Sequence, residues 1–69
     1  MSTRHTEILK LVKTNRLLYF PLGVNSLSSA DGFDQYVNGM DFKITPEGNV
    51  EWTGKDEVLG KDVVIVYER

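Results

Sequence analysis

The chain of 69 residues contains no cysteine and one histidine, His5. The lack of cysteine excludes disulfides, and one histidine without any cysteine cannot supply the usual ligand set of a structural zinc site. A domain of this size buries only about 60% of the surface that its unfolded chain exposes, and such domains commonly depend on a disulfide, a metal or a partner. We therefore expect one domain over residues 1–69 that has no cofactor and is stabilised by association with other proteins.

Long apolar runs and an excess of positive charge are also absent. No run approaches the roughly 18 residues that a membrane span needs, and the N-terminus does not have the apolar segment of a signal peptide. The chain has 8 basic and 10 acidic residues, with a net charge of −2, and the scattered basic residues do not form a nucleic-acid-binding stripe. We therefore expect neither a membrane nor a nucleic acid as partner, and a location in the cytosol or in a particle assembled there.

The second half of the chain has clear strand and turn signals. Asn38-Gly39 indicates a hairpin turn, because both residues tolerate a positive φ. Alternating apolar and polar side chains predict strands over 41–45 and 50–53, joined by a turn at Pro46–Asn49, and a third strand over 62–67. Alternation places the expected core on one face of these strands: Phe42, Ile44, Val50, Trp52, Val63, Ile65 and Tyr67.

The first half fits two patterns. Residues 6–14 match either a short helix or a strand. In the strand interpretation, Glu7–Val12 pairs antiparallel with Leu17–Leu22 across a turn at Lys13–Arg16, because the apolar second segment needs a sheet partner for its backbone groups. The serine-rich stretch Asn25–Asp34 is expected to be a loop.

Short motifs along residues 6–67 resemble, in their order and spacing, a module common in virion proteins of tailed bacteriophages. Such modules occur in tail fibres and in head or neck accessory proteins. The resemblance implies an all-β fold, a small antiparallel β-sandwich that is immunoglobulin-like in a loose sense, and it favours a strand for residues 6–14. The motifs are Tyr19-Phe20-Pro21-Leu22, Tyr36-Val37-Asn38-Gly39-Met40, Asp41-Phe42-Lys43-Ile44, Asn49-Val50-Glu51-Trp52-Thr53 and Gly60-Lys61-Asp62-Val63-Val64-Ile65-Val66-Tyr67.

No set of residues predicts catalysis, cofactor binding or a metal site. A general base needs a partner group within reach, and no residue near His5 identifies a nucleophile, so we expect His5 to be a flexible terminal residue. The two carboxylates of Asp31–Asp34 are too few for a calcium loop and indicate an Asx-type turn that leads into a strand. A winged helix–turn–helix is disfavoured, because residues 28–35 contain two acids and no base.

Two segments are apolar on both of their faces. Val64 and Val66 point away from the face that holds the expected core, and Tyr19 and Phe20 point to opposite sides of their segment. We expect these four residues and Phe33, in the serine-rich loop, to bind protein partners, which are copies of this chain, a major capsid protein or a tail protein.

The expected function is that of a non-enzymatic virion structural protein, a capsid decoration or cement protein or a head or tail accessory subunit. The alternative is a small phage-type intracellular inhibitor or adaptor that binds a host protein.

Overall fold

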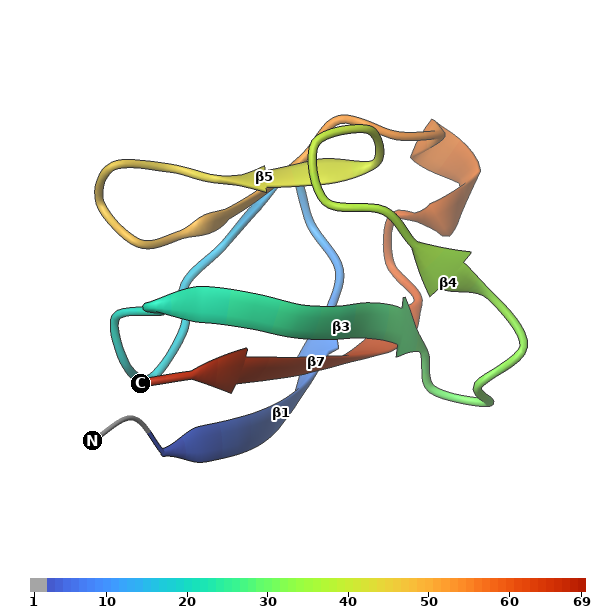
Figure 1. Ribbon diagram of the computed structural model, residues 1–69. Helices are drawn as coiled ribbons and strands as arrows, with labels where there is room; N and C mark the ends of the chain where they lie inside the picture. Colours follow the sequence, from blue (N-terminus) through green and yellow to red (C-terminus); the bar gives the residue numbers. More distant parts are fainter. Residues whose placement is uncertain (1–2) are drawn as a thin grey trace.

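In the computed structural model, which describes residues 3–69, seven strands form two antiparallel sheets that pack face to face (Figure 1). Sheet A contains, in spatial order, β1 (Arg4–Lys10), β7 (Asp62–Glu68), β3 (Gly23–Ser29) and β4 (Gln35–Tyr36). Sheet B contains β2 (Thr14–Asn15), β6 (Val50–Trp52) and β5 (Phe42–Ile44). A short 3-10 helix, η1 (Asp56–Val58), precedes β7. The fold is the predicted small β-sandwich, and residues 4–10 form a strand rather than a helix.

β7 is the central long strand of sheet A, between β1 and β3. Its buried residues alternate with half-buried ones: Val63, Ile65 and Tyr67 face sheet B, whereas Val64 and Val66 face the other way. The strand is therefore central in its sheet, and only one of its two apolar faces packs against sheet B.

The core lies between the two sheets. It includes six of the seven residues predicted from alternation, and Ile44, the seventh, is only partly buried because it lies at its edge. Two core residues were not predicted: Leu11, just after β1, and Leu27, in β3. The buried residues are Leu11, Leu27, Phe42, Val50, Trp52, Val63, Ile65 and Tyr67.

The predicted pairing of Glu7–Val12 with Leu17–Leu22 is wrong. β1 pairs with β7 instead, and Leu17–Leu22 forms no strand. This segment crosses from β2 of sheet B to β3 of sheet A (Figure 1). The backbone of the crossing finds partners outside a ladder, because the Leu18 N–H donates to Glu7 Oε2 (3.0 Å) and the Tyr19 N–H donates to the Tyr67 hydroxyl (3.2 Å).

The predicted loop Asn25–Asp34 is wrong over its first half, which belongs to β3. β3 pairs with both β7 and β4, and a bulge lies between Val24 and Ser26. Leu27 points into the core. Serine and asparagine have low strand propensity, but two neighbouring strands satisfy the backbone of this segment, so that sheet context outweighs local preference.

The Asn38-Gly39 turn is not a hairpin, because it connects β4 in sheet A to β5 in sheet B. Gly39 has a φ of 95°, and its N–H donates to the carbonyl of Phe42 (2.7 Å). The Asp41 carboxylate accepts the N–H of Val37 (2.9 Å), which fixes the chain as it changes sheets. The other predicted turn, Pro46–Asn49, is confirmed as the connection of the β5–β6 hairpin.

Candidate protein-binding surfaces

The face of sheet A that points away from sheet B has an uncharged centre. The register aligns Thr6 with Val66 and Ser26 in one row across β1, β7 and β3, and Ile8 with Val64 and Ser28 in the next. These residues are small or β-branched, so that the centre of the face has no long side chain. We call this surface the uncharged outer face; it consists of Thr6, Ile8, Ser26, Ser28, Val64 and Val66.

Charged residues lie at both ends of the uncharged outer face. At one end Arg4 pairs with Glu68 across the strands, with 3.6 Å between Arg4 Nε and Glu68 Oε2. At the other end Lys10 of β1 is aligned with Asp62 of β7. Ile8, Val64 and Val66 are thus surrounded by polar and charged residues, and apolar side chains inside a polar rim are usual in a protein–protein interface.

Nothing in the described part of the chain covers this face. Ile8 is 73% exposed, and Val64 and Val66 are half-buried. In Figure 1, sheet B lies on one side of β1, β7 and β3, and no described segment crosses the other side. The domain's own second layer therefore packs on Val63, Ile65 and Tyr67, and leaves the outer valines accessible.

Tyr19 belongs to a different surface, near the N- and C-terminal ends of the described chain. Its ring makes an edge contact with His5 (4.9 Å between centroids) and lies 3.9 Å from the guanidinium carbon of Arg69. His5 itself lies within β1 and also contacts Tyr67 (5.5 Å). The prediction that His5 is a flexible terminal residue is therefore wrong, because two aromatic rings hold it.

Phe20 lies beside the β5–β6 turn. The Phe20 ring fills the space beside Gly48, because a Cβ placed on that glycine would lie 2.6 Å from Phe20 Cδ2. The neighbouring Pro21 is buried, whereas Phe20 stays more than half exposed. Part of this ring therefore has a structural role, and part remains available to a partner.

Phe33 lies at the tip of the loop between β3 and β4 and is 85% exposed. The loop is the predicted Asx-type turn: Asp31 Oδ1 accepts the N–H of Phe33 (3.0 Å) and the hydroxyl of Ser29 (2.5 Å). The Ser29 bond, followed by the Phe33 bond, lowers the pKa of the Asp31 carboxyl.

The five residues predicted to bind partners thus lie in several places, and only Val64 and Val66 share one surface with each other.

Glu7 and Tyr67 form a polar pair at the edge of the core, and it is the contact that sequence analysis missed. The Tyr67 hydroxyl donates to Glu7 Oε2, which also accepts the Leu18 N–H. Burial, followed by this hydrogen bond, raises the pKa of Tyr67 to about 12. The two residues are 60 positions apart, so that no local pattern reveals the pair, and its partners indicate a structural role.

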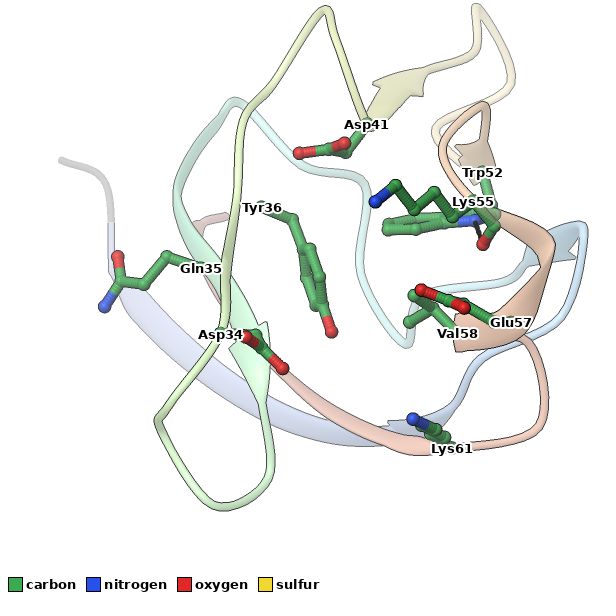
Figure 2. A pocket seen from close by; sticks show the side chains of 9 residues that line it. All are labelled: Asp34, Gln35, Tyr36, Asp41, Trp52, Lys55, Glu57, Val58 and Lys61. Carbon is green, nitrogen blue, oxygen red and sulfur yellow. Dashed lines mark hydrogen bonds between the residues drawn. The ribbon is translucent and has the colours of Figure 1, made fainter.

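A shallow pocket of about 300 Å³ lies where β4, β6 and η1 meet (Figure 2). Tyr36 and Trp52 form its aromatic wall, with ring centroids 5.0 Å apart and planes at 86°. Figure 2 shows Asp34, Asp41 and Glu57 on different sides of the pocket rather than converging on one point. Among residues 3–69, no three His, Cys, Asp or Glu side chains are grouped so that they could hold a metal ion.

The aromatic wall of the pocket is held in place by a hydrogen bond of Trp52. The Trp52 indole N–H donates to the Lys55 carbonyl (2.9 Å), which fixes the ring as part of the core. Beside the three carboxylates, the residues that line the pocket include two lysines, Lys55 and Lys61.

Comparison with protein-family models, with curated proteins and with solved structures finds no match to this chain. Within residues 3–69 no helix is long and apolar enough to cross a membrane.

Proposed function

We propose that this protein is a non-enzymatic structural subunit that binds other proteins through the uncharged outer face of sheet A. The observation that carries the proposal is that Val64 and Val66, on the central strand, lie on a face that no described residue covers. Water contact with valine is unfavourable by roughly 25 cal/mol per Å² of apolar surface, so that a partner on this face is favoured. A specific contact would bury more than about 1,000 Å² in total.

The assembly that we propose is a virion of a tailed bacteriophage, with the chain as a capsid decoration or cement subunit or as a head or tail accessory subunit. The order of the sequence motifs supports this proposal, and the β-sandwich is compatible with it. The second candidate is an intracellular inhibitor or adaptor that binds one host protein. The same two outward-facing valines favour it, because they fit any flat protein surface.

Substitution of both valines tests the proposed face. Val64→Lys combined with Val66→Lys places two charges at its centre, and we expect the variant to fold but to lose binding to purified particles in a sedimentation assay. Because Val37 and Met40 are exposed outside this face, Val37→Lys with Met40→Lys is a matched control that should still bind. Retained binding by the valine variant with an intact fold would move the interface to the Phe33 loop or the Tyr19 surface.

Abundance in particles distinguishes the two candidate functions. A decoration or accessory subunit should be present in purified virions in many copies, measured by quantitative mass spectrometry against the major capsid protein. An inhibitor should be absent from virions and should instead co-purify with one host protein from infected cells.

A further inference from the structure

β1 is a long strand at the edge of its sheet. It has seven residues, whereas the other edge strands, β4, β2 and β5, have two or three. Short edge strands limit unwanted pairing with other chains, and a long straight edge permits it. No bulge interrupts the register of β1 with β7.

The register shows which backbone groups of β1 are unpaired. Thr3 and Arg69 exchange two hydrogen bonds, of 3.1 and 2.9 Å, so that odd-numbered residues of this antiparallel ladder bond to β7. The N–H and C=O groups of Arg4, Thr6 and Ile8 therefore point to the open edge, where the described residues provide no partner.

The opposite end of the edge is already occupied. The Asn15 side chain donates to the carbonyl of Lys10 (2.9 Å). The open part of the edge therefore runs from Arg4 to Ile8, and it fits a short strand.

We propose that β1 pairs antiparallel with β1 of a second copy, across a two-fold axis at Thr6. Only even-numbered residues have free groups, so that hydrogen-bonded pairs must match even with even. Registers centred before Thr6 leave the groups of Ile8 without a partner among the described residues, and registers centred after Ile8 lie beyond the open segment, so the candidates are those centred on Thr6, Glu7 or Ile8. The registers centred on Glu7 and Ile8 pair Lys10 with a residue of the second copy and therefore require its carbonyl, which already accepts a hydrogen bond from Asn15. The register centred on Thr6 does not require this carbonyl.

Side-chain charges select the same register. The one centred on Glu7 would place Arg4 opposite Lys10 of the second copy, and Glu7 opposite Glu7, so that like charges face each other. The one centred on Thr6 places Thr6 opposite Thr6 and His5 opposite Glu7 of the second copy, so that no like charges face each other. Cross-strand Thr–Thr pairs and pairs of opposite polarity are favourable.

The pairing also covers an apolar side chain. Ile8, which is 73% exposed, faces Arg4 of the second copy, whose aliphatic stem can pack on it. Two four-stranded sheets would join into one sheet of eight strands, and the two uncharged outer faces would become continuous. The inference rests on the proposed function only in that both concern a protein-binding subunit, since it uses backbone groups rather than the valines.

Single cysteines can report the register, because the chain has none of its own. In the register centred on Thr6, the two Thr6 Cα atoms are about 5.5 Å apart, within the range of a disulfide. We expect Thr6→Cys to form a covalent dimer under mild oxidation, on a non-reducing gel, and Glu7→Cys and Ile8→Cys to do so at least tenfold more slowly. Equal rates for all three, or a faster rate for either control, would overturn the proposed register.

Analytical ultracentrifugation tests the edge itself. The unmodified chain should change from monomer to dimer as its concentration rises. Thr6→Pro removes an N–H that β7 does not use, so that it should keep the fold by circular dichroism and stay monomeric. The Val64→Lys, Val66→Lys variant should still dimerise, which separates this proposal from the proposed function. A chain that is monomeric at every concentration, or a Thr6→Pro dimer, refutes edge pairing.

Discussion

Tyr67 shows how one side chain can connect parts of the molecule that lie far apart in the sequence. Its ring is in the core, and its hydroxyl both accepts the Tyr19 N–H and donates to Glu7. Alternation in the last strand correctly predicted that the ring is buried. The hydroxyl's partners could not be predicted, because they depend on a crossing segment that has no regular pattern.

The raised pKa of Tyr67 makes stability depend on pH in the alkaline range. An unfolded tyrosine ionises near pH 10, and the folded one near pH 12. The folded state therefore holds this proton more tightly, and the contribution to stability is complete below pH 10 and is lost as the pH rises from about 10 to 12. Spectrophotometric titration should show a late tyrosinate step, which Tyr67→Phe removes. A late step that persists in Tyr67→Phe would assign it to Tyr36, whose pKa is also raised, first by burial.

At the scale of elements, the sequence predicted strands where apolar and polar side chains alternate, as in β5, β6 and β7. It was wrong where backbone groups find partners outside that pattern. Leu17–Leu22 has the composition of a strand, but side chains from β1 and β7 accept its N–H groups. β3 has the composition of a loop, but its neighbours in sheet A complete it.

The β5–β6 turn depends on a glycine. Gly48 has a φ of 84°, and the Phe20 ring occupies the space where a Cβ would lie. Gly48→Ala is therefore expected to lower the free energy of unfolding by more than about 1 kcal/mol, measured by urea denaturation, because alanine is strained at a positive φ. Gly23→Ala is the matched control, since no atom lies within 4 Å of its Cβ position, and it should change stability little. Equal costs for the two variants would contradict this account of the turn.

At the scale of the whole molecule, Trp52 connects the two sheets. It belongs to β6 of sheet B, is 3% exposed, and makes an edge contact with Tyr36 of β4 in sheet A. The uncharged outer face, by contrast, could be predicted only in part. Alternation identified Val64 and Val66, but Ser26 and Ser28 belong to this face only because β3 lies beside β7.

Trp52→Ala is expected to cost about 3–5 kcal/mol, since it leaves a large cavity between the sheets. For so small a domain this loss is comparable to the total stability, so that thermal melting should shift strongly downward or disappear. Met40→Ala, at an exposed position, should melt like the unmodified chain. An unchanged melting temperature for Trp52→Ala would show that the indole does not hold the layers together.

The order of strands in sheet A also has a consequence for folding kinetics. β1 and β3 do not pair with each other; each pairs with β7, which follows both of them in the chain. Neither β1 nor β3 can therefore form its hydrogen bonds to β7 until a long loop has closed, and such non-local pairing slows folding. The β5–β6 hairpin is local and can form first. Until β7 inserts, both edges of β1 and the β7-facing edge of β3 are open, so that a crowded solution of refolding chains should aggregate at this stage rather than after the sheet is complete.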